Sequence, residues 1–315
     1  MPVDPSTAKF LELLQAAPGT PLWETPLAQA RANMAAGAQF GVAPAAVGSI
    51  ADHRVETPNG PIAVRVYTPL TQQSDVPVGA VLQFHGGGYV LGNLDTHESI
   101  ARYYCAHAGV VVVSVDYHLA PEHRFPTQLH DGYAALCWVA AQASALGVDP
   151  GRIGVAGDSA GGNLAAALCA YARAHGGPSI ACQGLLYPVT DFRDHATYPS
   201  HAEFGGGEYF LSNDDMDWFR AQYLADVAQA ADPLASPMAA SDLSGLPPAL
   251  VTTCGVDPLR DEGQAYADRL AGAGVPVTYR CFETTIHACA SFAGVLPAGR
   301  EMLDLAAAWL KAQLA

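Results

Sequence analysis

The stretch GDSAG, residues 157–161, places Ser159 between two glycines, where the apolar run RIGVA gives way to a helical pattern. A strand that turns sharply into a helix needs small residues around the turn, and it exposes the central side chain at the strand end. A serine hydroxyl in that position can attack a carbonyl carbon if a base accepts its proton. Ser159 is therefore the candidate nucleophile, and the alternative is an ordinary glycine-rich turn.

A nucleophilic serine needs a histidine base, and in strand–turn–helix sites the chain order is serine, acid, histidine. Of the 11 histidines, only His287 lies beyond the last plausible acid at a strand end, in a loop after VPVTYRCFE. We therefore expect His287 to be the base. The other histidines are expected to be structural or surface residues.

Two aspartates compete for the role of the acid that orients this histidine. Asp257 directly follows the apolar run PALVTTCGV and is the favoured candidate, whereas Asp191 follows GLLYPVT and is its competitor. Asp261 and Glu262 fall in the first turn of the next helix, where a negative charge favours the helix dipole.

Three consecutive glycines, Gly86 to Gly88, follow an apolar run and His85. Such a run is entropically costly, so it indicates that something must approach bare backbone there. The tetrahedral oxyanion of acyl transfer needs N–H donors, which an H-G-G-G loop and the residue after the nucleophile can supply. We expect Gly86, Gly87 and Ala160 to form this oxyanion hole. A phosphate-binding loop is disfavoured, because neither G-K-[ST] nor G-x-G-x-x-G is present.

The elements that must position these residues follow an α/β pattern. Two alternating runs flank Asn59-Gly60 and predict a hairpin. Nearly continuous apolar runs then alternate with helical stretches, which is typical of a parallel sheet covered on both faces. The apolar runs are 78–85, 109–117, 152–157, 180–189, 248–257 and 275–283, and the helical stretches are about 96–108, 127–146, 160–174, 260–273 and 299–314. The sequence therefore predicts a mostly parallel sheet of about eight strands.

The predicted domain organisation has two parts. Residues 1–45 carry helical patterns without strands and are expected to form N-terminal cap helices, while residues 46–315 form the catalytic domain. The aromatic, acidic segment 190–225 breaks the alternation and is expected to contribute to the cap. We expect five of its aromatic side chains to line a pocket, namely Phe204, Tyr209, Phe210, Trp218 and Phe219.

Composition narrows the class of protein. The 315 residues are 50% hydrophobic and carry a formal net charge of −15, which argues against nucleic acid and anionic membrane surfaces as partners. No signal peptide or membrane-spanning run is recognised, and the seven cysteines form no C-x-x-C pair. These features predict a cytoplasmic protein with reduced, buried thiols, no metal site and no cofactor.

Four motifs in order resemble those of the bacterial branch of the hormone-sensitive-lipase-like esterases, a family of the α/β-hydrolase superfamily. They are HGGG at 85–88, DYHLAPEHRFP at 116–126, GDSAGGN at 157–163, and DPLRDEG at 257–263 ahead of His287. The resemblance covers roughly residues 45–315. It implies the α/β-hydrolase fold with an N-terminal helical cap, and a carboxylic ester hydrolase with Ser159, Asp257 and His287 as its triad.

The sequence departs from that family at two positions. His118 stands where the second motif usually has arginine, so the partner of this residue is open. Cys289 stands where an aromatic residue commonly follows the catalytic histidine by two. We also expect Tyr89, Asp158 and Phe210 to contact the substrate.

Several alternatives remain at this stage. An amidase or formamidase would use the same triad, and a non-catalytic small-molecule-binding protein could share the fold. Ser6 and Lys9 match the S-x-x-K motif of β-lactamase-like serine esterases, but its partner motifs S-D-N and K-T-G are missing, so the match is attributed to chance. We expect short- to medium-chain acyl esters as substrates, and a homodimer is possible.

Overall fold

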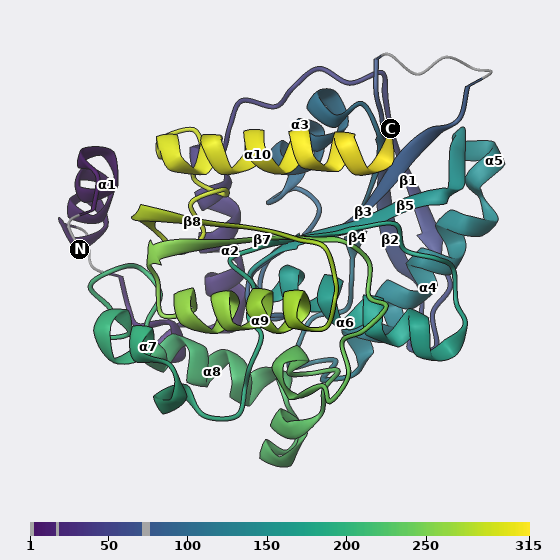
Figure 1. Ribbon diagram of the computed structural model, residues 1–315. Coiled ribbons are helices and arrows are strands. Elements are labelled where there is room, and N and C mark those ends of the chain that lie inside the picture. The colour runs from purple at the N-terminus through teal and green to yellow at the C-terminus, as the bar shows by residue number, and fades with distance from the viewer. Residues whose placement is uncertain (1–2, 17–18, 71–75) are drawn as a thin grey trace.

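The computed structural model of the chain describes residues 3–16, 19–70 and 76–315; residues 1–2 and 17–18 of the predicted cap segment lie outside it. An eight-stranded sheet runs through its centre in the order β1-β2-β4-β3-β5-β6-β7-β8 (Figure 1). The strands are β1 (Ser49–Val55), β2 (Ile62–Thr68), β3 (Val78–Phe84), β4 (Val111–Asp116), β5 (Val148–Asp158), β6 (Gln183–Leu186), β7 (Ala249–Val256) and β8 (Val277–Ile286).

The pairing of the strands confirms a mostly parallel sheet. Strand β2 pairs antiparallel with both β1 and β4. The remaining neighbours pair parallel, in the order β4, β3, β5, β6, β7 and β8. The predicted hairpin forms with Val55 opposite Ile62, so Asn59-Gly60 lies within the connection 56–61. Gly60 has a φ of +110°, a backbone conformation that only glycine adopts readily.

Two strands differ in length from the apolar runs that predicted them. β6 is limited to Gln183–Leu186, because Tyr187 has a φ of +35° and Pro188 follows it. β8 continues past the predicted end to Ile286, so it runs directly into the loop that begins with His287.

Helices cover both faces of the sheet (Figure 1). α3 (Glu98–Ala108) and α10 (Pro297–Leu314) lie on one face, with α4 (Thr127–Ala141), α6 (Ala160–His175) and α9 (Arg260–Gly272) on the other. The short helix α5 (Ala143–Leu146) leads into β5. Side chains of β4 alternate between these layers: Val112 packs with residues of α3 and α10, and Val113 packs with residues of α6.

Two further segments lie beyond the carboxyl ends of the parallel strands. The N-terminal segment contains α1 (Pro5–Ala16), α2 (Leu27–Gly37) and the short 3₁₀ turns η1 (Leu22–Glu24) and η2 (Ala38–Phe40). The insertion contains η3 (His195–Thr197), α7 (Pro199–Phe204) and α8 (Asn213–Tyr223), followed by η4 (Val227–Ala231) and η5 (Pro237–Ala239). Figure 1 shows α1 and α7 on the side where β7 and β8 end. The helices predicted in residues 1–45 are therefore present.

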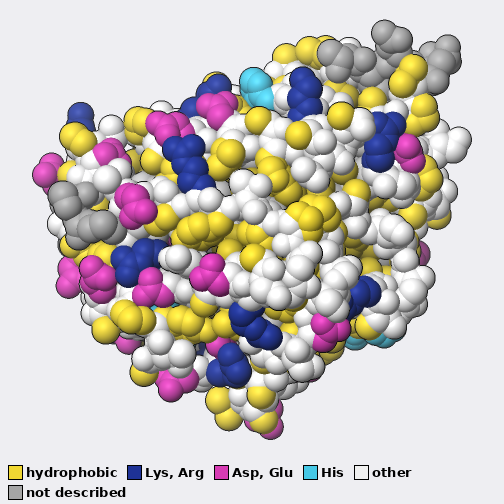
Figure 2. Space-filling model, in the orientation of Figure 1, with side chains coloured by type: hydrophobic (Ala, Val, Ile, Leu, Met, Phe, Trp, Pro, Cys, Tyr) yellow, Lys and Arg dark blue, Asp and Glu magenta, His cyan; other side chains and the backbone are white. Residues whose placement is uncertain are grey.

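One face of the molecule shows how its surface charges are arranged. On the face shown in Figure 2, acidic and basic side chains are interspersed among apolar ones. All seven cysteines are free thiols; five are buried, whereas Cys137 and Cys281 are partly exposed. Within the described ranges, no helix combines the length and the apolar character that a membrane crossing requires.

Candidate active site

Ser159 lies at a strained turn between β5 and α6. Its backbone has a φ of +54°, which is unfavourable for a residue with a side chain and is typical of a nucleophile elbow. A Cβ at Gly157 would come within 2.2 Å of the Gly161 carbonyl oxygen, and one at Gly161 within 2.2 Å of the Phe84 carbonyl oxygen. The two glycines of the motif are therefore required by the close approach of backbone at this turn.

A chain of hydrogen bonds joins the three predicted catalytic side chains. His287 Nε2 lies 2.9 Å from Ser159 Oγ, and His287 Nδ1 lies 2.7 Å from Asp257 Oδ2. Asp257 is fully buried, and its other oxygen accepts the Leu259 N–H at 2.9 Å. Both carboxylate oxygens thus have donors, which fixes the aspartate and, through it, the imidazole.

Asp191 is occupied elsewhere. Its carboxylate accepts hydrogen bonds from the Arg193 guanidinium at 2.7 and 2.8 Å and from the Tyr198 hydroxyl at 2.9 Å. Although burial raises the pKa of Asp191, these donors outweigh it and hold the pKa below its usual value. Of the two aspartates considered from the sequence, Asp257 is the one that contacts His287.

The glycine loop between β3 and α3 presents bare backbone toward Ser159. Gly87 and Gly88 have φ values of +110° and +61°. A Cβ at Gly87 would lie 2.4 Å from the Leu91 carbonyl oxygen, and one at Gly88 would lie 2.1 Å from the Phe219 ring. Within the described residues, the N–H groups of Gly87 and Gly88 have no hydrogen-bond acceptor. Ala160 is the first residue of α6, where a backbone N–H has no partner within the helix.

A side-chain acceptor competes for the Gly86 N–H, which the sequence predicts to be an oxyanion donor. The Gly86 N–H donates to Asp158 Oδ1 at 3.0 Å, and His97 Nε2 lies 3.3 Å from both the Gly86 nitrogen and Asp158 Oδ1. A donor already bonded to a carboxylate is not free to receive an oxyanion. The sequence could not reveal this, because Asp158 is 72 residues away from Gly86.

Two buried histidines, His85 and His97, contact the backbone or side chains that hold the glycine loop in place. His85 stacks on the Tyr117 ring, with centroids 4.2 Å apart, and the Tyr117 hydroxyl donates to the His85 carbonyl oxygen at 2.7 Å. Burial, reinforced by His97, lowers the pKa of His85 to about 3, so its imidazole is neutral at physiological pH. For Asp158, burial raises the pKa, but His97 and the Gly86 N–H outweigh it and lower the pKa overall. Sequence reasoning missed His97, whose surroundings carry no motif signal.

A cavity of about 580 Å³ lies above Ser159 and His287. Its lining includes all three residues predicted to contact substrate, Tyr89, Asp158 and Phe210. The two tyrosine rings of Tyr89 and Tyr223 stack 3.7 Å apart, and Phe210 is 39% exposed at a φ of +81°. The N-terminal segment supplies much of the remaining wall, through Phe10, Leu14, Leu22, Met34 and Phe40, among others.

Only two of the five aromatic residues predicted in the insertion line this cavity, namely Phe210 and Phe219. Phe204 is buried away from it, beneath the Arg260 guanidinium and edge-on to Tyr209. Trp218 packs edge-on against Phe219, with centroids 5.2 Å apart, and does not line the cavity. The composition of the segment indicated an aromatic wall, but the helix orientation decides which rings reach it.

The two departures from the family motifs have structural partners. His118 Nδ1 lies 2.8 Å from Asp131 Oδ2, and the same oxygen accepts the His118 N–H at 2.9 Å. Cys289 Sγ lies 3.7 Å from Cys254 Sγ, beneath the loop that carries His287. The Ser6 and Lys9 pair lies on α1, and neither residue lines the cavity. In the parts of the chain that are described, no group of three or more His, Cys, Asp or Glu side chains is arranged to hold a metal.

Known proteins are similar to this chain in sequence and in fold. Residues 81–291 match a family described as the alpha/beta hydrolase fold. The chain is 45% identical over 244 residues to the carboxylic ester hydrolase LipN of Mycobacterium tuberculosis, covering 76% of this chain but only 63% of LipN. It is 43% identical over 257 residues to the esterase LipI of the same organism, covering 80% of this chain and 78% of LipI.

A solved esterase structure from Pyrobaculum calidifontis superposes with a TM-score of 0.90 at 39% identity, and the match covers 99% of both chains. The chain belongs to the hormone-sensitive-lipase-like esterase family. The α/β-hydrolase fold expected from its motifs is therefore confirmed. Membership in this esterase family agrees with the order of elements seen here, in which serine, aspartate and histidine follow β5, β7 and β8.

Proposed function

We propose that this chain hydrolyses carboxylic esters through an acyl-enzyme, with Ser159 as nucleophile, His287 as general base and Asp257 as the acid that orients it. The observation that supports this most strongly is the continuous chain of hydrogen bonds from Asp257 through His287 to Ser159 at the floor of the cavity. LipN and LipI, which are named as ester hydrolases, add support from sequence similarity.

The geometry suits a two-step acyl transfer. As Ser159 Oγ attacks the ester carbonyl carbon, His287 Nε2 accepts the hydroxyl proton, and the carbonyl oxygen becomes an oxyanion. The N–H groups of Gly87, Gly88 and Ala160 stabilise that charge. The intermediate then collapses as His287 donates its proton to the leaving alcohol. Water attacks the acyl-serine, gives a proton to His287, and releases the acid as Ser159 regains its proton.

The shape of the cavity favours short- to medium-chain acyl esters presented as dissolved molecules. Side chains of the N-terminal segment and of α8 cover the floor, so we propose that residues 1–45 act as a cap to which 190–225 contributes. Such a cover excludes water from the reacting groups and strengthens their electrostatics. It also limits the room for a long acyl chain.

A panel of p-nitrophenyl esters of increasing acyl length, assayed beside an anilide and an emulsified long-chain triglyceride, tests this function. We expect the highest kcat/KM among the short and medium esters. Faster hydrolysis of the anilide would indicate an amidase, and faster hydrolysis of the emulsion would indicate an interfacial lipase. Binding without turnover of any substrate would indicate a non-catalytic protein.

A further inference from the structure

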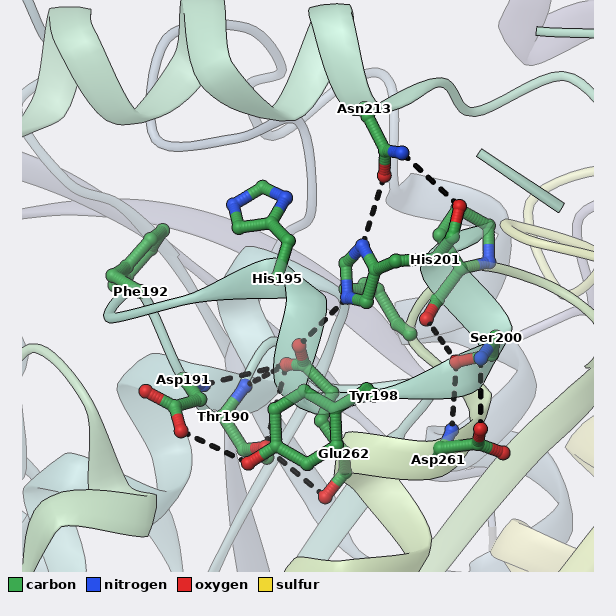
Figure 3. A network of polar contacts seen from close by, with 12 residues as sticks. Thr190, Asp191, Phe192, His195, Tyr198, Ser200, His201, Asn213, Asp261 and Glu262 are labelled. Carbon is green, nitrogen blue, oxygen red and sulfur yellow. Dashed lines mark hydrogen bonds and ion pairs between the residues drawn. The ribbon is translucent and has the colours of Figure 1, made fainter. Parts of the chain in front are cut away.

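A buried polar network outside the triad connects the insertion to the segment that carries the catalytic aspartate. His201 of α7 lies between Asn213, the first residue of α8, and Glu262 in the first turn of α9 (Figure 3). His201 Nδ1 lies 2.9 Å from Asn213 Oδ1, and His201 Nε2 lies 3.4 Å from Glu262 Oε2. The histidine is 3% exposed and the glutamate is fully buried. Glu262, which is expected from the sequence to favour the helix dipole, therefore also contacts a specific side chain.

Both ends of this network are connected to the active site, one through the segment that follows Asp257 and the other through α8. Glu262 lies on the helix whose first turn begins with a hydrogen bond from the Arg260 N–H to the Asp257 carbonyl oxygen at 3.1 Å. Beside His201, the Ser200 hydroxyl donates to the Pro258 carbonyl oxygen at 2.6 Å, next to Asp257. At the other end, α8 carries Met216 and Phe219, which line the cavity.

The donors and acceptors around His201 require that one proton be shared between His201 Nε2 and Glu262 Oε2. Asn213 Nδ2 donates to the His201 carbonyl oxygen at 3.0 Å, so Asn213 Oδ1 is the acceptor that faces Nδ1, and Nδ1 must carry hydrogen. Glu262 Oε1 accepts the Thr190 N–H at 2.6 Å. The remaining contact joins His201 Nε2 to Glu262 Oε2, and it is a hydrogen bond only while one of these atoms is protonated.

We propose that His201 is a positioning residue for ester hydrolysis: its bonds to Glu262 and Asn213 fix α8, which lines the cavity, against the segment that carries Asp257. The bond to Glu262 maintains the position of the catalytic aspartate, and the bond to Asn213 maintains the start of α8. The inference rests on the proposed triad and adds to it a residue that contacts neither the substrate nor the reacting atoms.

The ionisation of the pair supports this arrangement. Burial lowers the pKa of His201, but its contacts with Glu262 and Asn213 outweigh burial and raise the pKa overall, while burial raises the pKa of Glu262. A raised pKa means that the contact is complete at low pH and is lost as the pH rises through that pKa. The other ionisable groups that interact with the pair are Tyr89, Tyr198, Asp191, Asp257 and His195, the last beside Asp217 and Arg220.

Three substitutions of His201 separate its two bonds. His201→Gln places an amide nitrogen near the position of Nε2, so it keeps the bond to Glu262 and loses the one to Asn213. His201→Asn places an amide nitrogen near the position of Nδ1, so it keeps the bond to Asn213 alone. His201→Ala loses both side-chain bonds, whereas the bond from Asn213 Nδ2 to the backbone carbonyl oxygen of residue 201 remains in all three variants. His195→Gln is the control, because the His195 ring contacts the His201 ring at 4.7 Å but does not contact Glu262.

Steady-state kinetics on a soluble p-nitrophenyl ester, with circular dichroism to confirm folding, tests the proposal. We expect His201→Ala to lower kcat about tenfold and to raise KM, because small displacements of positioned groups are costly. His201→Gln should recover kcat but not KM, His201→Asn should recover KM but not kcat, and His195→Gln should match the wild type. The proposal is overturned if kcat and KM of His201→Ala stay within about twofold of wild type. It is equally overturned if the Gln and Asn variants differ from wild type only in melting temperature.

The pH profile provides a readout that a purely structural role would not change. The wild-type kcat should decline at alkaline pH as the His201–Glu262 pair loses its proton, and His201→Gln, whose amide donates at every pH, should lack that decline. Equal alkaline declines in both proteins would contradict the proposal. Failure of the proposed function would be distinct, because it would show as activity retained in Ser159→Ala, whatever the His201 variants do.

Discussion

At the floor of the cavity, the backbone fixes the proposed reacting groups. Ser159 lies on a turn that two glycines permit, and His287 directly follows the last residue of β8. In the roof, which α2 and α8 help to form, Met34 and Phe219 are positioned by side-chain contacts between elements, both packing and hydrogen bonds such as that from Arg31 to the Val90 carbonyl oxygen. The difference implies a division of roles. Changes in the floor should act on kcat, because they move groups that act in the transition state, whereas changes in the roof should act on KM and on acyl-chain preference.

Removal of the floor's nucleophile or base should give the largest effect. Ser159→Ala and His287→Ala are each expected to lower kcat about 10⁴-fold or more, because each eliminates a member of one proton-transfer unit. Stopped assays on purified, folded variants would measure this. A Ser159→Ala protein that kept a tenth of wild-type kcat would place the nucleophile elsewhere.

The two aspartates sharpen the comparison within the floor. Asp257→Asn should lower kcat by about 10³- to 10⁴-fold, since an amide cannot hold the imidazole in the same way. Asp191→Asn is the matched control, because its carboxylate bonds Arg193 and Tyr198 and not His287. It should affect mainly the melting temperature. A large loss of kcat confined to Asp191→Asn would reverse the assignment.

A substitution in the glycine loop 86–88, called the oxyanion loop for its proposed role, should have an intermediate effect on kcat. Gly87→Ala should lower kcat about 10²- to 10³-fold with a smaller change in KM, because a displaced N–H donor acts mainly in the transition state. Gly176→Ala is the matched control: Gly176 has a φ of +60°, and a Cβ there would meet nothing within 4 Å. If both variants had wild-type kcat, the loop glycines would serve only the turn.

The roof should respond differently. Met34→Ala enlarges the cavity beside the oxyanion loop, and we expect kcat/KM for longer acyl esters to rise several-fold relative to acetate, with kcat for acetate little changed. Leu13→Ala, on the exposed side of α1 at 63% exposure, should leave the chain-length profile unchanged. Identical profiles for the two variants would mean that the N-terminal segment does not shape the acyl site.

The smallest effect is expected from Asp158, whose carboxylate contacts His97 and the Gly86 N–H beneath the glycine loop. Because the pKa of Asp158 is lowered in the folded protein, its contribution to stability is present above the unfolded pKa of about 4 and is lost as the pH falls through the folded value. The melting temperature of wild type should therefore exceed that of Asp158→Asn by a few degrees at neutral pH, and the gap should close in acid. A gap independent of pH would contradict this role.

The sequence predicts a residue's position well where neighbouring residues determine it, and poorly where contacts with distant residues determine it. That Ser159, Asp257 and His287 lie together could be predicted, because the turn, the strand ends and the chain order are local signals. The bond from the Gly86 N–H to Asp158 could not be predicted in this way, because Asp158 arrives from a distant strand. Phe204 was misplaced because the orientation of α7 depends on contacts with α9, including Arg260 over its ring. Likewise, nothing near His201 in the sequence indicates that Glu262 is its partner.

The most direct measurement of the central claim is covalent trapping of the nucleophile by an aryl phosphonate ester, followed by mass spectrometry of the digested protein. A phosphonylated serine resembles the tetrahedral intermediate and does not turn over, so the label reports the residue that attacks. We expect one label per chain on the peptide that contains Ser159, appearing in step with loss of esterase activity, and no label on Ser159→Ala. Stoichiometric labelling of another residue, or inactivation without a label on Ser159, would contradict the account.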